Sequence, residues 1–386
     1  MSEARPRMCV LAATPLTIHF FLKPHLQDLA RYFEVTLACN LRSDSYLPPL
    51  DLPVRELAVP MERRIAPWRD LLALFSLFRL FGRARFDIVV TVVPKAGLLG
   101  MLAAWLLRVP RRVHIFQGEV WASRRGPMRW LLKWMDGLTA RLATHVLVVS
   151  ASERSFLESE GVVPSGKAQL LGAGSICGVD TEKFRADPTS RVRVRAELGI
   201  PEQAVLCVFL GRLTADKGVL ELAQAFALSA ATRSDLWLLL VGPDEEQMGP
   251  RLRDLVPEHI KPRMVISGFS QKPEEVLAAS DFLCLPSYRE GLGMVVLEAA
   301  AVGIPAIGTR IHGITDAIED GRTGRLVSVG DVEALSEAIT RWCDHPEERG
   351  LFAAAARDRV IFTFKQQSVV DRYVEYFRNL FCGRCH

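Results

Sequence analysis

Residues 286–308 read PSYREGLGMVVLEAAAVGIPAIG, and their pattern indicates the class of fold. It overlaps the end of a short apolar run, FLCLP at 282–286, and its middle part, MVVLEAAAVG, has the composition of a buried helix. A strand, a glycine-containing loop and a helix in this order are typical of one unit of a parallel α/β sheet. The stretch also keeps two carboxylates, Glu290 and Glu298, among mostly apolar and glycine residues.

Similar apolar runs recur along the whole chain, separated by segments of helix length. In the first half we expect strands at 8–13, 35–39, 87–93, 112–116 and 145–150. In the second half we expect them at 204–210, 236–242, 264–267, 282–286 and 305–308. Runs that are apolar on both faces are typical of parallel sheets covered by helices on both sides. The pattern therefore predicts an α/β fold with two doubly wound, Rossmann-like domains.

The boundary between the domains is expected near GAGSICGVDTEKFRADP at 172–188, which is rich in glycine and small residues. We expect an N-terminal domain at 1–180, a C-terminal domain at 181–365, and a final helix at 366–386 that packs back across them. Residues 1–180 hold 23 Lys and Arg against 15 Asp and Glu, whereas residues 181–386 hold 25 against 29. A basic half and an acidic half predict different partners for the two domains.

The N-terminus, MSEARPRMCVLAATPL, does not read as a secretory signal, and no apolar run is long enough to span a bilayer. We therefore expect a cytoplasmic protein with reduced cysteines. In the tail, Cys382, Cys385 and His386 have the spacing of a c-type haem attachment site. A protein without an export signal does not normally receive that haem, so we expect no role for them.

The loop GRLTADKG at 211–218 follows the expected strand 204–210. Ligands of doubly wound sheets bind where the strands end. Gly211 lets the chain approach a ligand closely, and Arg212 and Lys217 supply a guanidinium fork and an ammonium group. This combination suits a diphosphate. The alternative is two ordinary solvated cations in a surface loop.

The amides of residues 291–294 are expected at the N-terminus of the helix that follows the strand 282–286. Such a terminus attracts anions through its free N–H groups and its dipole. Glu290 would precede this helix and Glu298 would lie about one turn inside it, so each could bind different hydroxyl groups of one ligand. The alternative is a surface glutamate and a partly exposed helical one.

The succession GRLTADKGVLELAQAF, SGF and AASDFLCLPSYREGLGMVVLEAAAVGIPAIGTRIHGITDAIEDGRTGRLV resembles the C-terminal domain of family 4 glycosyltransferases, from about residue 204 to 330. The resemblance implies the GT-B fold, in which two Rossmann-like domains face each other across a cleft. It also implies a retaining glycosyltransferase that takes a sugar from a nucleotide donor and uses no metal ion or other cofactor.

The resemblance assigns roles to individual residues. Glu290 matches the first glutamate of the family's E-x7-E motif, which contacts the donor sugar, and Glu298 matches the second, which binds the ribose. Arg212 and Lys217 match the pair that binds the diphosphate. The remaining donor contacts are with the nucleobase at Gly268 and Phe269, and with the phosphates at Leu292, Gly293 and Met294.

The first half is similar to bacterial transferases that act on polyprenyl-diphosphate-linked sugars. The similar segments are PKAGLLG (94–100), HIFQGEVW (114–121), ARLATHVLVVSASERSFL (140–157) and GSICGVDTEKF (174–184). The resemblance implies a UDP-sugar donor of N-acetylhexosamine type, a lipid-linked saccharide acceptor, and a role in surface polysaccharide or glycan assembly. His114 matches a catalytic histidine that points from an N-domain strand to the donor sugar. The alternative for His114 is a buried core residue.

One segment departs from the family pattern. Many members carry a glycine-rich loop after the first strand, whereas this chain has ATPLTIHFFLKPHL, which contains no glycine. Contacts with the acceptor are therefore less defined, and the candidates are His19, Lys23 and Lys95.

Two basic and aromatic segments lie at 61–86 and 121–142, each with Arg or Lys mixed with Trp, Phe and Leu at roughly helical spacing. This mixture is typical of helices that lie in a membrane interface. The alternative is a core-packed helix with a solvated basic face. The basic first half favours anionic lipid or a lipid diphosphate, so we expect peripheral contact with the inner membrane. No nucleic-acid motif accompanies these segments, and we expect no nucleic-acid partner.

Three other functions fit parts of the pattern. A synthase of sucrose or trehalose type would use a soluble acceptor and would not bind membranes. A non-catalytic nucleotide-sugar-binding protein would bind UDP without turnover. An epimerase of UDP-N-acetylglucosamine shares the two-domain fold, but the E-x7-E context favours transfer.

Overall fold

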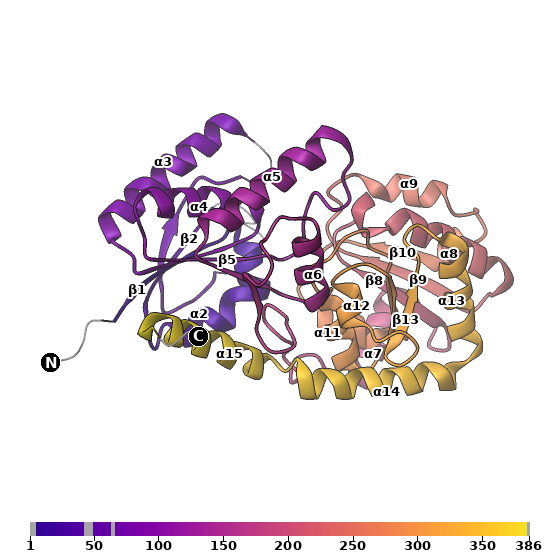
Figure 1. The fold of residues 1–386 in the computed structure, drawn as a ribbon. Coiled ribbons are helices and arrows are strands. Elements are labelled where there is room, and N and C mark those ends of the chain that lie inside the picture. The colour runs from indigo at the N-terminus through magenta and orange to yellow at the C-terminus, as the bar shows by residue number, and fades with distance from the viewer. Residues whose placement is uncertain (1–4, 42–48, 63–65, 384–386) are drawn as a thin grey trace. The chain divides into compact units, whose positions relative to one another are not determined.

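The computed structural model describes residues 5–41, 49–62 and 66–383. The chain divides into two compact units, Met1–Gly178 with Gln367–His386, and Val179–Gln366. The expected limits at 180 and 365 lie within two residues of these divisions. Each unit contains one parallel sheet flanked by helices, which confirms the predicted class of two Rossmann-like domains (Figure 1).

The sheet of the first unit has seven strands in the order β3-β2-β1-β4-β5-β6-β7. Every pair of neighbours is parallel. The strands are β1 Arg7–Leu11, β2 Glu34–Cys39, β3 Arg55–Ala58, β4 Ile88–Val92, β5 Arg111–Ile115, β6 His145–Val148 and β7 Ala168–Leu170. The register places Val10 of the central strand β1 between Leu37 of β2 and Val90 of β4, so the sheet is buried around its centre.

Helices cover both faces of this sheet (Figure 1). They are α1 Pro15–Thr17, the π-helix η1 Ile18–Leu22, α2 Lys23–Leu29, α3 Pro67–Ala84, α4 Pro94–Leu106, α5 Gly126–Leu142, α6 Ala151–Ser159 and α15 Gln366–Cys382. Leu77 and Phe81 of α3 belong to the buried cluster that includes Leu11 of β1. On the opposite face, side chains of α2 and α15 surround an apolar gap against β1, β4 and β5. The final helix is thus part of the first unit.

The sheet of the second unit has six strands in the order β10-β9-β8-β11-β12-β13, again all parallel. The strands are β8 Val205–Leu210, β9 Leu236–Val241, β10 Met264–Ser267, β11 Phe282–Leu285, β12 Ala306–Thr309 and β13 Gly324–Val327. The longer helices are α7 Pro188–Glu197, α8 Val219–Thr232, α11 Met294–Val302, α13 Val332–Asp344 and α14 Pro346–Thr363. Shorter ones are α9 Met248–Asp254, α10 Pro273–Ala279, α12 Ile314–Ala317 and the 3₁₀ turns η2 Ala215–Lys217 and η3 Lys261–Arg263.

Three strands were not predicted from the sequence: β3, β7 and β13. Each lies at the outer edge of its sheet. An edge strand has a neighbour on one side only and keeps more contact with water, so its sequence needs fewer apolar residues. The segments RELA, AQL and GRLV therefore lack the continuous apolar run that marked the central strands.

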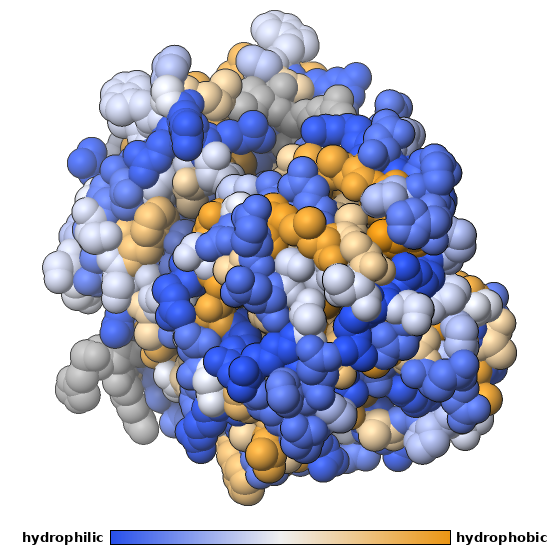
Figure 2. Space-filling view, turned by 90° about the vertical axis from the view of Figure 1, so that its right-hand side faces the viewer, coloured by the Kyte–Doolittle hydropathy of each residue, from blue (hydrophilic) through white to orange (hydrophobic). Residues whose placement is uncertain are grey.

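On the face of the molecule in Figure 2, hydrophilic side chains predominate and smaller hydrophobic areas lie between them. No helix in the described part of the chain is long and apolar enough to cross a membrane. Cys382 is exposed at the end of α15, whereas Cys385 and His386 lie outside the described residues.

A buried arginine fastens α7 to the second sheet. Arg195 is 2% exposed, and its guanidinium donates to the carbonyl oxygens of Ala279 (2.8 Å) and Ala204 (2.8 Å). It also binds Asp281 Oδ2 at 2.7 Å, and the same oxygen accepts the N–H of Leu206 in β8 at 2.7 Å. The guanidinium of Arg195 thus binds groups at the end of α10, in the loop before β8 and directly before β11.

Replacing Arg195 with alanine should lower the free energy of unfolding of the second unit by about 1.5–3 kcal/mol, because the carbonyl oxygens of Ala279 and Ala204 would lose their donor and Asp281 would keep only the more exposed Arg191 as its cationic partner. Chemical denaturation followed by circular dichroism measures this loss. Arg193→Ala, which removes two more exposed ion pairs of the same helix, should lower it much less. Equal losses of unfolding free energy for the two substitutions would contradict the role of Arg195 in fastening α7 to the sheet.

Candidate functional site

The carboxyl end of the second sheet, where its parallel strands end, brings together the residues selected from the sequence. β8 and β11 are neighbours in this sheet. The loop after β8 carries Arg212 and Lys217, and the loop after β11 carries Glu290. Adjacent parallel strands end side by side, so loops that are about 70 residues apart in the sequence meet at one place.

Glu290 is bound by groups from both loops. Its Oε1 atom accepts hydrogen bonds from Lys217 Nζ (2.5 Å) and from Ser287 Oγ (2.9 Å). The side chains of Lys217 and Glu290 are 16% and 15% exposed. Ser287 is fully buried, and its carbonyl oxygen accepts a hydrogen bond from Thr309 at the end of β12. The carboxylate is therefore held in place yet remains partly open to solvent.

The expected diphosphate-binding groups also have acidic partners. Arg212 Nη1 donates to Glu245 Oε2 at 3.0 Å, and the N–H of Ala215 donates to Glu246 Oε2 at 3.0 Å. Both glutamates belong to the exposed loop after β9. These carboxylates accept hydrogen bonds from the same donor groups that would bind an anionic ligand. Gly211, directly after β8, donates its N–H to Val241 at the end of β9 at 2.9 Å.

A second ion pair joins the two loops. Arg289 Nη2 lies 2.7 Å from Asp216 Oδ2, and the N–H of Tyr288 donates to the carbonyl oxygen of Asp216 at 2.9 Å. Burial alone would raise the pKa of Asp216, but Arg289 and the Thr214 hydroxyl outweigh it and hold the pKa below its usual value. Sequence reasoning missed this pair, because the pairing of charges in two distant loops becomes visible only once the strands are adjacent.

Tyr288 is tied to α8 by a further hydrogen bond. Its hydroxyl donates to Glu221 Oε1 at 2.7 Å. Burial raises the pKa of Tyr288 to about 12, and the neighbouring Glu221 adds to this effect. Tyr288 therefore stays a neutral hydrogen-bond donor, and it fixes the start of the loop that ends in Glu290.

Two glycines allow backbone segments to touch at this end of the sheet. Gly313 has φ +82°, and a Cβ atom there would lie 2.7 Å from the carbonyl oxygen of Glu290 and 2.6 Å from that of Gly291. Gly218 has φ +69°, and a Cβ atom there would lie 2.0 Å from the carbonyl oxygen of Pro286. Any other residue would displace the loop that carries Glu290.

Glu298 lies inside α11, as expected. It is half-buried, and burial raises its pKa to about 7, against the attraction of Lys183 and together with the repulsion of Glu274. Lys183 itself pairs with Glu274, with Nζ and Oε2 3.5 Å apart. Before α11, Leu292 is buried and Gly293 is the N-cap, and Met294 is the half-buried first residue of the helix.

Gly268 and Phe269 follow β10, the strand at one edge of the second sheet. Gly268 is exposed, and a Cβ atom at this position would meet open space. Its carbonyl oxygen accepts the N–H of Gly242, which follows β9, at 3.2 Å. Both residues thus lie at the carboxyl end of the sheet, with β9 between their strand and β8.

The structure corrects the expectation for His114. The residue was expected to leave its strand towards a sugar, but it lies within β5 and is 1% exposed. Its Nδ1 atom is 2.8 Å from Thr91 Oγ1 of β4, and its ring packs where a Cβ atom of Gly97 in α4 would be. Burial lowers its pKa to about 3, so the ring is a neutral core residue. The strand was identified correctly, but the side chain at this register faces the interior.

The three acceptor candidates lie at the carboxyl end of the first sheet. His19 belongs to the π-helix after β1, Lys23 begins α2, and Lys95 lies in the first turn of α4. Lys95 Nζ pairs with Asp70 Oδ1 of α3 at 2.8 Å. Just before it, Val93 has φ +69°, an unfavourable value for a β-branched residue. Such strain is common at functional turns.

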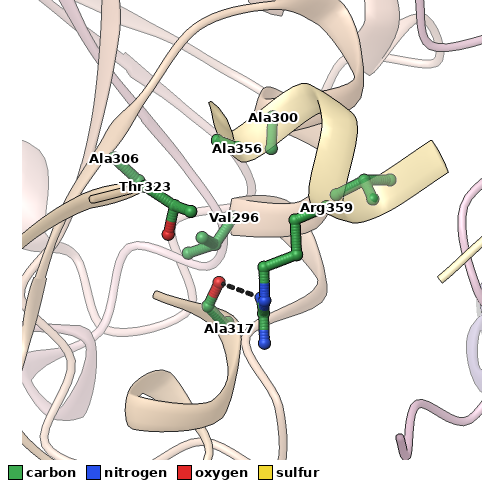
Figure 3. Close-up of a pocket in the computed structure, with 8 residues that line it drawn as sticks. Val296, Ala300, Ala306, Ala317, Thr323, Ala356 and Arg359 are labelled. Carbon is green, nitrogen blue, oxygen red and sulfur yellow. Dashed lines mark hydrogen bonds between the residues drawn. The ribbon is translucent and has the colours of Figure 1, made fainter. Parts of the chain in front are cut away.

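The pocket in Figure 3 lies between α11, α12 and α14. Its lining is mainly the small side chains of alanine and valine, with Arg359 from α14 at one side. The Arg359 guanidinium donates to the carbonyl oxygen of Ala317 at 2.9 Å and to that of Asp316 at 2.5 Å. Arg359 therefore holds the end of α12, the short helix that begins directly after Gly313. No group of three or more metal-ligating side chains is found among the described residues.

The comparisons with known proteins identify the family. A family model described as glycosyl transferases group 1 matches residues 190–359, and one described as glycosyl transferase 4-like domain matches residues 25–174. The chain belongs to the family 4 glycosyltransferases, as its motifs predicted.

Two curated relatives are similar over most of their length. The chain is 28% identical over 311 residues to the capsular polysaccharide biosynthesis glycosyltransferase CapM of Staphylococcus aureus, with 81% of each chain covered. It is 26% identical over 349 residues to UDP-Gal:alpha-D-GlcNAc-diphosphoundecaprenol alpha-1,3-galactosyltransferase of Escherichia coli, with 89% of each covered.

A solved structure confirms the fold. Alr3699/HepE of Anabaena, in complex with UDP and glucose, has a TM-score of 0.78 and 17% identity. The alignment covers 97% of this chain and 100% of that one.

The pKa of Glu298 makes a prediction about pH. Because the carboxyl binds its proton more tightly when folded, stability should fall as pH rises from about 4.5 to about 7. Glu298→Gln removes the titratable carboxyl. Above pH 7 this variant should be more stable than the unmodified protein by about 2 kcal/mol, and below pH 4 the two should be equally stable. Unfolding curves across this pH range measure the difference. A gap that does not change with pH would contradict the burial of this carboxyl.

Proposed function

We propose that the protein is a retaining glycosyltransferase of polysaccharide or glycan assembly. In this proposal it moves a sugar, of N-acetylhexosamine type, from a UDP-sugar to a saccharide linked to polyprenyl diphosphate. The observation that carries the proposal is the meeting of Arg212, Lys217 and Glu290 at the carboxyl end of the second sheet. The Escherichia coli relative, whose name specifies a diphosphoundecaprenol-linked acceptor, supports the acceptor class, and the UDP complex of the Anabaena structure supports the nucleotide.

The donor would exchange partners with the pairs found in the structure. The diphosphate would take Arg212 from Glu245 and Lys217 from Glu290, and the amides of Leu292 to Met294 would add the N-terminal dipole of α11. Glu290, released from Lys217, would bind hydroxyl groups of the sugar. Glu298, inside the same helix, would accept hydrogen bonds from the ribose, and Gly268 and Phe269 would lie against the base.

The chemistry follows from this arrangement of charge. As the bond between the anomeric carbon and the phosphate oxygen breaks, negative charge grows on the leaving diphosphate, and Arg212 and Lys217 stabilise it. The acceptor hydroxyl attacks from the same face of the sugar and passes its proton to the leaving phosphate oxygen. Because the two side chains neutralise this charge, the proposal includes no metal ion and no other cofactor.

Glu290→Gln should lower the rate of sugar transfer by about 100-fold or more, because the amide cannot replace the charged acceptor of the sugar hydroxyls. UDP affinity should be unchanged or higher, because Lys217 loses a competing carboxylate. Lys217→Ala should lower the rate of transfer and should also weaken UDP binding. The measurements are transfer of label from a panel of UDP-sugars into lipid extracted from bacterial membranes, and calorimetric titration with UDP.

Glu258→Gln is the matched control, since this carboxylate is 87% exposed and lies outside the site. Near-normal transfer by Glu290→Gln would overturn the assigned role. Release of UDP with soluble sugars, and no label in lipid, would assign a soluble acceptor instead.

The proposal includes peripheral contact with the inner membrane through the first unit, in the cytoplasm. The helices α3 and α5 both pack on α4, and their outer surfaces carry large apolar side chains. In α3 these include Trp68, Leu71, Leu72 and Phe75, and in α5 they include Met128, Trp130, Leu131 and Trp134, all between 41% and 76% exposed. The described part of the segment 61–86 is thus apolar on its outer face as well as on its buried one.

These side chains lie at one end of their helices. All eight fall in the first nine residues of α3 or α5. Both helices lead into strands of a parallel sheet, so they run opposite to the strands and begin at its carboxyl end. The cations Arg69 and Arg129, paired with Glu62 and Glu160, accompany the apolar residues. Basic residues beside exposed tryptophans are typical of helices at a membrane surface. A lipid-linked acceptor would therefore be presented on the side where the acceptor candidates lie.

The double substitution Trp130→Ala with Trp134→Ala should weaken binding to vesicles of phosphatidylglycerol and phosphatidylcholine by about tenfold or more, since each buried aromatic contributes about 1.5–3 kcal/mol. Vesicle sedimentation measures the partition. Phe362→Ala, which removes an 84% exposed aromatic of the second unit, should leave it unchanged. Equal partition of all three proteins would exclude α5 as the contact.

A further inference from the structure

A basic groove lies in the first unit, between α3 and the strands β1, β2 and β3. It has a volume of about 530 Å³, within the range of pockets that hold small organic ligands. Among the described residues, its lining contains one glutamate, Glu34, and four arginines, Arg7, Arg55, Arg79 and Arg83. Because guanidinium groups stay protonated at physiological pH, this lining has an excess of three positive charges.

The floor of the groove is formed by the strands where they begin. Arg7, Glu34 and Arg55 are the first residues of β1, β2 and β3. Arg7 is paired in register with Glu34, and Thr36 of β2 is paired with Arg55. Residues opposite one another, and residues two apart in one strand, lie on the same face of a sheet. These side chains therefore share the face that lines the groove.

The wall of the groove is one side of α3. It consists of residues spaced three and four positions apart, Ser76, Arg79, Leu80 and Arg83. Arg7 fastens the end of this helix to the sheet. Its Nη1 atom donates to the carbonyl oxygen of Ala84 at 3.0 Å, and its Nε atom donates to Glu34 Oε2 at 3.2 Å. The only acidic side chain of the described lining is thus already paired with Arg7.

The other three arginines have no acidic partner in the part of the chain that the structure describes. Arg55, Arg79 and Arg83 are all exposed. The guanidinium of Arg79 lies over the ring of Phe75, 4.6 Å from its centroid. Like charges around one groove repel one another, and an anion bound between them would relieve this repulsion. The groove therefore favours an anionic ligand.

The groove also offers apolar surface. Leu57 of β3 and Leu80 of α3 are half-buried in its lining, and Phe86 is buried beside them. Guanidinium groups match the oxygen geometry of phosphate, which carries up to two negative charges. Apolar surface beside them suits an organic body attached to the phosphate.

The position of the groove separates it from the reactants of the proposed transfer. The contact between Arg7 and Ala84 places the last turn of α3 at the amino end of the sheet. The acceptor candidates lie at the opposite, carboxyl end. Along α3, the interval from the exposed Trp68 to Arg83 is about 22 Å. A ligand in the groove is therefore neither the acceptor nor part of the proposed lipid surface.

We propose that this groove is a binding site for a soluble organic molecule that carries phosphate groups. Arg55, Arg79 and Arg83 bind the phosphate oxygens, and the organic part lies against Leu57 and Leu80. The site belongs entirely to the first unit, so this inference does not depend on the proposed glycosyl transfer.

Amide hydrogen exchange of the full chain tests the site, with ADP and inorganic pyrophosphate as probes at about 0.15 M salt, where exposed charges are screened. ADP should slow exchange in residues 55–59 and 76–86. In the double variant Arg55→Ala with Arg83→Ala, the ADP concentration that gives half of this protection should rise about tenfold or more, because charge-assisted hydrogen bonds are lost. Its melting temperature should be unchanged, because both side chains are exposed.

The matched control is Arg31→Ala with Arg141→Ala, which removes the same charge from two exposed positions of the first unit outside the groove. This control should bind ADP as the unmodified protein does. Arg55→Lys with Arg83→Lys keeps the charge but loses the planar fork, so its protection should be intermediate.

Two results would overturn the site. One is the absence of protection at 55–59 and 76–86 with both probes, and the other is equal protection of the unmodified protein and the alanine double variant. Sedimentation with phosphatidylglycerol vesicles separates a soluble ligand from a lipid headgroup. The alanine double variant should sediment like the unmodified protein. Reduced sedimentation, without protection by either probe, would assign the groove to the membrane surface and exclude the soluble ligand.

Discussion

Contact between backbone segments at Gly313 is the constraint on which the second unit's site depends. The position of the Glu290 carboxylate follows from the path of its loop, and the carbonyl oxygens of Glu290 and Gly291 lie directly against Gly313. Gly313 in turn precedes α12, and α12 is held by Arg359 of α14. Contacts thus connect α14, through α12 and Gly313, with the loop that carries the Glu290 carboxylate. The loop is therefore supported by backbone at Gly313, which cannot move without displacing α12.

The charges at this end of the sheet are balanced in the absence of a ligand. Lys217 pairs with Glu290, Arg212 with Glu245, and Arg289 with Asp216. The three pairs differ in burial: the first and last are mostly covered, whereas Arg212 and Glu245 are each more than one-third exposed. Exposed pairs contribute little free energy. In the proposed exchange, a diphosphate would therefore take Arg212 from Glu245 at small cost, while the Arg289–Asp216 pair would keep the two loops together.

The sequence allowed most of the fold and the centre of the site to be predicted, for physical reasons that particular residues illustrate. Strands with two neighbours are buried on both faces, so runs such as AVLCVFL were recognised, whereas the edge strands β3, β7 and β13 were not. Motif spacing placed Glu290, Arg212 and Lys217 together. His114 was expected to point towards a sugar but lies in the core. The direction of a side chain depends on register within a strand, and an apolar run does not fix its own register. The partners Glu245 and Asp216 were missed because they act across 30 to 75 residues of sequence.

The two sheets end in different kinds of surface. At the carboxyl end of the second sheet, acidic side chains pair with the cations Arg212, Lys217 and Arg289. At the carboxyl end of the first sheet, the two acidic groups Glu119 and Glu153 are buried. The cations Arg69, Arg129 and Lys133 of α3 and α5 pair with glutamates and lie on helices that expose tryptophans. An exposed apolar surface is unfavourable in water alone, and the proposed contact with a lipid layer would cover it.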